Sequence, residues 1–175
     1  MKQSQILNKF ETERLIMLPT SADDGQLIFE LMTAPKFIQF VGDRGLTSAA
    51  DGAYYVAEKM LPHFEKNGFG SYTMVLKSNN EKIGTCGLYN REGVEGVDIG
   101  FELLPQFEGR GYAYEVANKM KQVAVNELQI STILAITHKQ NLASQKLLKK
   151  IGLKEIGTTP LPGETEEILL FSSKI

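Results

Sequence analysis

The sequence is poor in the features that mark several classes of protein. It has one cysteine, Cys86, and no tryptophan among its 175 residues. A single cysteine excludes an intramolecular disulfide and a cysteine-rich zinc site, and it suits a reducing compartment. No stretch approaches the ~20 consecutive apolar residues that cross a bilayer, and the opening residues lack the apolar core of a signal peptide. We therefore expect a cytoplasmic protein that does not associate with membranes.

The sequence also has no large excess of positive or negative charge. Nineteen Lys and Arg residues face 21 Asp and Glu residues, a formal net charge of −2. This balance disfavours nucleic acid or an anionic membrane surface as a bulk partner. His63 and His138 are isolated, so we expect no metal site. The length predicts a single domain over residues 1–175, large enough to bury a core.

The most informative stretch runs from Val97 to Leu128. Apolar and polar residues alternate over residues 97–103, as in a strand whose two faces differ. Glycines at 109 and 111 follow, and an apolar stripe at helical spacing occupies residues 113–128. Free N–H groups and the dipole at a helix start favour an anion such as a pyrophosphate. The alternative is a plain glycine turn that caps a helix.

Three phosphate-binding loops compete for this pattern. No Gly-x-x-x-x-Gly-Lys-Ser/Thr run exists, and the glycine spacing differs from the dinucleotide-binding motif. The run from Glu108 to Ala113 (EGRGYA) closely resembles the coenzyme A loop of the GNAT acetyltransferase family, Gln/Arg-x-x-Gly-x-Gly/Ala. Glu108 departs from it, standing where Gln or Arg is usual. Gln106 gives a literal match, but two residues too early relative to the helix.

The remaining elements predict an α+β domain with a mixed sheet. About seven mostly antiparallel strands and four helices are expected, with one parallel crossover through the central helix. The expected strands cover residues 13–18, 70–77, 82–89, 97–103, 131–137, 153–157 and 167–172. The expected helices cover residues 21–32, 47–67, 113–128 and 141–151.

Two further segments resemble the same family. The opening ETERLIML is similar to the start common among ribosomal-protein N-terminal acetyltransferases of the RimJ/RimL type, although Leu18 stands where Arg is frequent. The segment NLASQKLLKKIGLKEIG resembles the family's Asn-x-x-Ser helix, with Leu153 at a usual Phe position. The chain is therefore identified as a member of the GNAT family, a resemblance that implies the acyl-CoA N-acyltransferase fold over nearly its whole length.

The resemblance also implies a coenzyme site. Acetyl-CoA would be the cosubstrate, with its pyrophosphate on the loop and its pantetheine paired with backbone near the end of the central strand. Asn141 would cap its helix and contact the coenzyme. The residues expected to bind acetyl-CoA are Leu103, Leu104, Gly109, Arg110, Gly111, Tyr112, Ala113 and Asn141.

The resemblance implies that the acceptor amine attacks the thioester of acetyl-CoA directly. Such an attack needs the amine in its neutral form. Glu102 is the candidate base, because alternation places it with Asp98 on the strand face opposite Phe101 and Leu103. The alternative is an ordinary polar residue on a solvated face. His138 follows a predicted strand and is a second candidate by its usual pKa, although the sequence favours an ordinary surface loop histidine. A water chain is the third possibility.

The leaving thiolate needs a proton or direct release to water. Many family members carry a Tyr seven residues after the helix-start Asn, and here that position is Leu148. Ser144 is the hydroxyl nearest the expected site, with a simple first-turn helix residue as the alternative. Cys86 is expected in the core, since direct attack needs no acyl-enzyme.

Together these observations predict an acetyl-CoA-dependent N-acetyltransferase that acts on a protein N-terminal α-amine. The alternatives are a small-amine acetyltransferase (polyamine, aminoglycoside or amino acid) and a coenzyme A-binding module without catalysis. Either a monomer or a homodimer fits the sequence.

Overall fold

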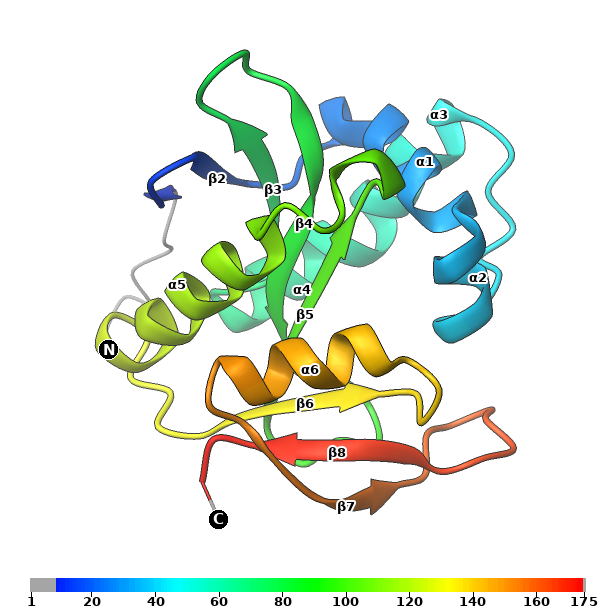
Figure 1. Ribbon diagram of the computed structural model, residues 1–175. Helices are drawn as coiled ribbons and strands as arrows, with labels where there is room; N and C mark the ends of the chain where they lie inside the picture. The colour runs from blue at the N-terminus through cyan, green and yellow to red at the C-terminus, as the bar shows by residue number, and fades with distance from the viewer. Residues whose placement is uncertain (1–8, 175) are drawn as a thin grey trace.

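The computed structural model describes residues 9–174, which build one mixed sheet between two layers of helices (Figure 1). The sheet has eight strands in the order β1-β2-β3-β4-β5-β6-β8-β7. Every neighbouring pair is antiparallel except β5 and β6. The strands are β1 (Phe10–Glu11), β2 (Leu15–Pro19), β3 (Ser71–Leu76), β4 (Lys82–Tyr89), β5 (Val97–Leu103), β6 (Ile133–Thr137), β7 (Lys154–Thr159) and β8 (Ile168–Ser172).

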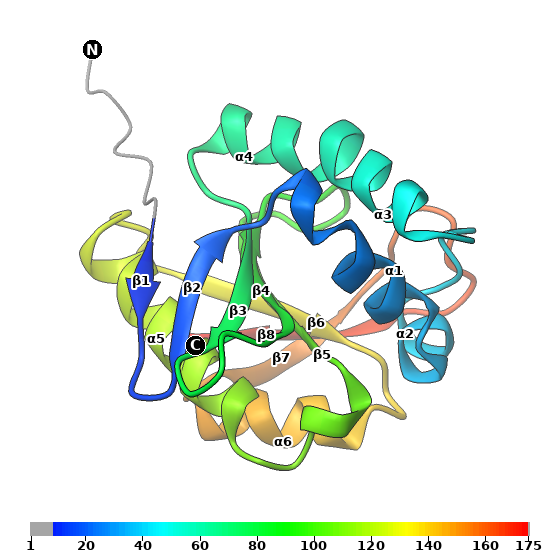
Figure 2. The same ribbon diagram turned by 90° about the horizontal axis from the view of Figure 1, so that it is seen from above.

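Helices cover both faces of the sheet (Figure 2). On one face lie α1 (Gly25–Thr33), α2 (Pro35–Phe40), α3 (Ala49–Tyr55) and α4 (Leu61–Asn67). The other face carries α5 (Tyr112–Asn126) and α6 (Leu142–Lys150). Short 3-10 turns, η1 (Ala22–Asp24) and η3 (Pro105–Phe107), precede α1 and the glycine loop. Among the described residues, no helix is long and apolar enough to cross a membrane.

The segment between α3 and α4 is a short π-helix, η2 (Val56–Met60). Pro62 lies in the first turn of α4 and has no N–H to donate to the carbonyl four residues earlier. The Leu61 N–H reaches the Val56 carbonyl instead, which widens the turn. The predicted helix over residues 47–67 is therefore one continuous helical segment with a local bulge.

The helices on the first face approach one another closely at two glycines. A Cβ built on Gly52 of α3 would lie 2.0 Å from the carbonyl oxygen of Gly25 in α1. Only glycine fits such a backbone contact. The crossing fixes α1 and α3 as a unit, and α2 extends from it over the edge of the sheet (Figure 1).

The core lies on both sides of the central strands. It includes Met17, Tyr72, Met74, Ile83, Cys86, Leu88, Val116, Met120, Ile133 and Phe171, all at most 1% exposed. Cys86 is among them, and burial raises the pKa of its thiol well above the usual range. The prediction that Cys86 is a core residue is confirmed.

The strand and helix counts differ from the predicted seven and four. Two residues, Phe10 and Glu11, pair with Met17 and Ile16 as an additional edge strand, a piece too short to show any alternation. Pro35 divides the first helical region, because it starts α2 directly after Ala34. The fold class and the parallel crossover through α5 are confirmed.

Candidate active site

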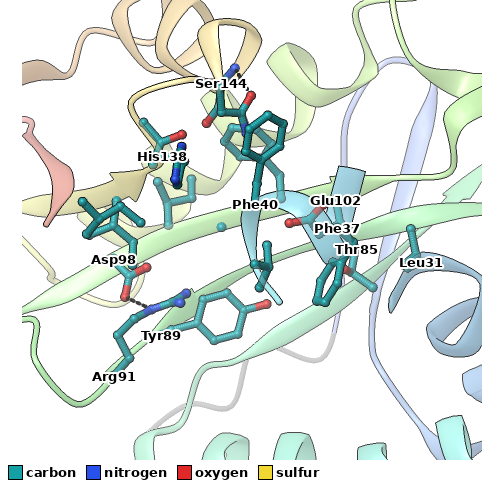
Figure 3. Close-up of a pocket in the computed structure, with 18 of the residues that line it drawn as sticks. Leu31, Phe37, Phe40, Thr85, Tyr89, Arg91, Asp98, Glu102, His138 and Ser144 are labelled. Carbon is teal, nitrogen blue, oxygen red and sulfur yellow. Dashed lines mark hydrogen bonds and ion pairs between the residues drawn. The ribbon is translucent and has the colours of Figure 1, made fainter. Parts of the chain in front are cut away.

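A cavity of about 950 Å³ opens between the two helical layers (Figure 3). Strands β4 and β5 form one wall, α1 and α2 a second, and the start of α6 with the loop after β7 a third. Six residues predicted from the sequence line it: Glu102, Leu103, Gly109, Ala113, Asn141 and Ser144. The remaining four, Leu104, Arg110, Gly111 and Tyr112, are not part of its lining.

The cavity exists because β5 and β6 pair only at their first residues. Val97 faces Ile133 and Asp98 faces Leu134, after which the two strands diverge (Figure 1). Beyond that point no strand among residues 9–174 pairs with the β6 side of β5. An extended ligand with amide groups fits such an open strand edge.

The register of β5 on β4 decides which backbone groups face this gap. The Leu104 N–H donates to the Ile83 carbonyl, and the Leu104 carbonyl accepts from Phe107 N. Because antiparallel pairs alternate, the N–H and C=O groups of Leu103 and Phe101 point away from β4, toward the gap. The Leu104 backbone is therefore engaged within the protein, whereas Leu103 and Phe101 turn their backbone groups toward the gap. Phe101 was not among the residues predicted from the sequence.

The glycine loop leads directly into α5. Gly109 and Gly111 have φ of +73° and +83°, a left-handed conformation that favours glycine. A Cβ on Gly109 would meet no protein atom within 4 Å, so the loop faces open space. The first N–H groups of α5 have no partner within the helix. Loop and helix start together fit a bound pyrophosphate.

Glu102 lies on the cavity wall opposite Thr85 of β4 and is only partly exposed. Burial is the main cause that raises its pKa to about 7, and the nearby charge of Glu108 raises it further, whereas Arg91 lowers it. A carboxyl with such a pKa exchanges its proton near neutral pH. The solvated strand face that the sequence left open is thus a cavity wall.

Asn141 and Ser144 lie at the start of α6 and line the cavity, and Figure 3 shows Ser144 above this wall. The Asn141 side chain accepts a hydrogen bond from Ser144 N at 3.2 Å, which confirms Asn141 as the N-cap. Ser144 itself is half-buried and lines the cavity. Leu148, one turn further along, is 1% exposed and belongs to the core, so the usual acid position holds an apolar side chain.

His138 lies at the end of β6 and lines the same cavity. Its ring is 5.7 Å from the ring of Phe40 in α2, and its Nδ1 accepts a hydrogen bond from Gln140 N. It is therefore a half-buried cavity residue rather than a free surface histidine. His63 also lines the cavity, and its Nε2 accepts a hydrogen bond from Asn90 N at 3.0 Å. No group of three metal-ligating side chains occurs in residues 9–174.

The far end of the cavity holds a buried ion pair that sequence reasoning missed. Arg91 Nε donates to Asp98 Oδ1 at 2.9 Å, and Asp98 is fully buried. The guanidinium also lies 5.3 Å from the ring of Tyr89. Burial is the main cause that raises the pKa values of Tyr89 and Asp98. The signal was present, because Tyr89 and Asp98 are partners across the β4–β5 hairpin.

Comparison with known proteins agrees with this geometry. The model of an acetyltransferase (GNAT) domain matches residues 14–154. The chain belongs to the GNAT acetyltransferase family.

Its relatives cover most of its length. The uncharacterized N-acetyltransferase YoaA of Bacillus subtilis is 26% identical over 148 residues, 84% of this chain and 83% of YoaA. An acetyltransferase structure from Agrobacterium tumefaciens superposes with a TM-score of 0.77 at 25% identity, covering 94% of this chain and 92% of that one. An aminoglycoside acetyltransferase in complex with coenzyme A shares the fold, with a TM-score of 0.72, 16% identity and coverage of 90% and 93%.

This GNAT protein is an N-acetyltransferase, an enzyme that uses acetyl-CoA and an amine acceptor. The site suits that cosubstrate, since the open glycine loop, the helix start and the unpaired edge of β5 follow one another along the cavity. The prediction of an enzyme is therefore confirmed over the alternative of a coenzyme A-binding module without catalysis.

Proposed function

We propose that this GNAT enzyme acetylates the α-amine of a protein or peptide N-terminus, with Glu102 as the base. The observation that carries the proposal is the position of Glu102 on the cavity wall with a pKa of about 7. A base of that strength matches an amine that loses its proton near neutral pH.

The acceptor class follows from the cost of deprotonation. An α-amine with a pKa of about 7.7–8.0 is roughly 10–15% neutral at pH 7. A lysine amine near 10.4 is neutral only about 0.04% of the time, a difference of roughly 3–4 kcal/mol. Glu102 can accept the proton of an α-ammonium with little loss, whereas a lysine would need a stronger base.

Residues 109–113 would hold the coenzyme through their backbone. The N–H groups for the pyrophosphate would come from Gly109, Gly111 and the first turn of α5. Arg110, Tyr112 and Ala113 complete the backbone of this loop and helix start. The open backbone of Leu103 and Phe101 would pair with the pantetheine arm and polarise the thioester carbonyl. In this order the acetyl group would lie beside Glu102.

Ser144 would lie nearest the leaving sulfur. Its backbone N–H is occupied by Asn141, which orients the residue on the first turn of α6. The hydroxyl can donate a hydrogen bond to a developing thiolate, and direct release to water is the alternative. Loss of Ser144 should therefore reduce the rate less than loss of Glu102.

The experiment measures thiol release from acetyl-CoA with two acceptor pools. One pool holds peptides with free N-terminal Ser, Ala or Met, and matched peptides with a blocked N-terminus but a free Lys. The other pool holds polyamines, aminoglycosides and amino acids. Turnover confined to free N-termini, located on the α-amine by mass spectrometry, would support the proposal. Turnover confined to Lys side chains or small amines would overturn it.

A small basic amine is the second candidate, and one observation favours it. Glu164, Glu166 and Glu167 line the cavity from the loop between β7 and β8. Three carboxylates at one mouth attract a cationic acceptor. If this candidate is right, Glu164→Gln and Glu166→Gln raise KM for polyamines and leave KM for neutral peptides unchanged.

A further inference from the structure

Two segments that lie about a hundred residues apart in the sequence meet at the start of α5. Thr12 Oγ1 donates to Glu115 Oε1 at 2.5 Å, across 103 residues of sequence. Arg14 N donates to the same oxygen at 2.8 Å, and Arg14 Nε donates to Glu115 Oε2 at 2.7 Å. Both oxygens of Glu115 are therefore held by the segment between β1 and β2.

Arg14 also touches the glycine loop itself. Its Nη1 donates to the Arg110 carbonyl at 3.0 Å, and its guanidinium lies 4.3 Å from the centre of the Tyr112 ring. A Cβ on Gly111 would lie 3.3 Å from Arg14 Nη2. One side chain thus contacts three consecutive loop residues and the first turn of the following helix.

These contacts give Thr12 and Arg14 of the opening ETERLIML segment a structural role. Glu115 is largely shielded, with 18% of its side chain exposed. Burial opposes its ionisation, but the hydrogen bonds from Thr12 and Arg14 outweigh that and keep its pKa below the usual value. The carboxylate stays charged near the positive end of α5, and the guanidinium offsets that charge beside a loop suited to an anion.

We propose that Thr12, Arg14 and Glu115 form a clamp that holds residues 109–112 in the conformation that receives the coenzyme. Arg14 is a positioning residue, because it touches the loop rather than the reacting atoms. The proposal rests on the proposed function in one respect, the assignment of the pyrophosphate to this loop. Its structural part, an ordered loop and helix start, stands without any ligand.

The clamp predicts a specific kinetic pattern. Arg14→Met should weaken binding of coenzyme A and raise KM for acetyl-CoA about 5- to 10-fold, the size expected for a partly exposed ion pair with extra hydrogen bonds. At saturating acetyl-CoA, kcat and KM for the acceptor should stay within about twofold, because Glu102 is unchanged. Arg14→Lys should recover only part of the affinity, since a point charge cannot replace the planar fork.

The matched control is Glu11→Gln. Glu11 lies in the same N-terminal segment and pairs with Lys9 and Lys77, but its ion pairs do not reach α5. This variant should bind coenzyme A like the parent protein. Equal losses of affinity in Glu11→Gln and Arg14→Met would show a general effect of the N-terminal segment and would overturn the clamp.

Hydrogen–deuterium exchange without ligand provides the independent readout. The Glu115 N–H donates to the Gly111 carbonyl at 3.0 Å, so its protection reports order at the start of α5. Amides 115–118 should exchange faster in Arg14→Met than in the parent protein and Glu11→Gln. Unchanged exchange, or unchanged affinity for coenzyme A, would refute the clamp. If the parent protein binds no coenzyme A, the proposed function fails, and exchange still tests the clamp.

Discussion

The proposed coenzyme end and the proposed acceptor end of the cavity are built in opposite ways. The coenzyme end comes almost entirely from residues 101–115, a continuous strand, loop and helix start. The acceptor end draws on α2, the turn after β4, the end of β6 and the loop after β7. The first end is built from consecutive residues, which the clamp from the N-terminal segment holds in place. The second end is built from segments that are far apart in the sequence.

The difference matters for specificity. A cosubstrate shared by a whole family needs a constant cradle, and backbone groups on a rigid loop provide it. An acceptor that differs between members is recognised by side chains on loops and helix ends, which vary freely. The following predictions test this division, from the largest expected effect to the smallest.

Glu102→Gln should have the largest effect. We expect kcat/KM to fall about 100-fold at pH 7.5, a typical loss for a general base. In the parent enzyme the rate should rise with pH through an acidic limb near pH 7, because burial raises the pKa of Glu102 to about 7 and the carboxylate is the active form. The variant should lose that limb in a pH–rate profile.

Glu155→Gln on the exposed strand β7 is the control, and it should change neither rate nor profile. Full activity of Glu102→Gln across pH 6–9 would move the base to His138 or to water.

Arg91→Met, at the acceptor end, should lower the free energy of unfolding of the protein by about 2 kcal/mol, measured by urea unfolding. Asp98 is fully buried, and removal of its partner leaves a buried carboxylate uncompensated; the figure is reduced because Arg91 is partly exposed. The double variant Arg91→Met/Asp98→Asn should recover most of the loss.

The loss of stability in Arg91→Met should depend on pH, and Asp98 determines the direction of that dependence. Burial already raises the folded-state pKa of Asp98, and removal of Arg91 raises it further. The unfolded chain then ionises at lower pH than the folded one, so the deficit should grow as pH rises above about 4. An unfolding midpoint equal to the parent's at pH 7 would contradict this account.

Gly111→Ala should weaken binding of coenzyme A about 5- to 10-fold in calorimetry. The residue has φ of +83°, and alanine in that region costs about 1–2 kcal/mol. Gly45→Ala is the matched control: its φ is +72° and nothing lies within 4 Å of the added Cβ, so it carries similar backbone strain away from the loop. Equal weakening in both variants would point to general destabilisation.

Glu108→Gln should have the smallest effect, where the two ends meet. Glu108 pairs with Lys36 of α2 at the surface, and such exposed pairs contribute less than about 1 kcal/mol. Because the Glu108 charge raises the pKa of Glu102, its removal should move the acidic limb to lower pH. A shift to higher pH would show that Glu108 does not act on Glu102 through its charge.

Local patterns predicted the framework well. The bounds of β4 and β5 agree at both ends, because turn residues delimit both strands and residues 97–103 alternate between apolar and polar, and both are local properties. Asn141 is the N-cap of α6 as expected, and Gly152 follows the end of that helix in a left-handed conformation. The glycine loop was found for the same reason, since its chemistry lies within six consecutive residues.

The sequence was least informative where strand register or distant contacts decide the geometry. Leu104 was expected to offer its backbone, but its N–H is used by Ile83. Pairing across two strands, and not composition, determines which residue of an alternating strand faces a gap. The clamp of Arg14 on Glu115 went unseen because its partners lie 101 residues apart in the sequence. Arg91 and Asp98 lie only seven residues apart, so the β4–β5 hairpin could have indicated that pair.

The sequence alone therefore determined the family, most of the order of the elements and the position of the glycine loop, since each depends on residues close together in the chain. The tertiary structure alone decided that Glu102 lies in a cavity with its pKa near 7, and that Leu103 and Phe101 face the gap beside β6. Burial and strand register arise only when distant segments pack, so the chemistry of the site is set there.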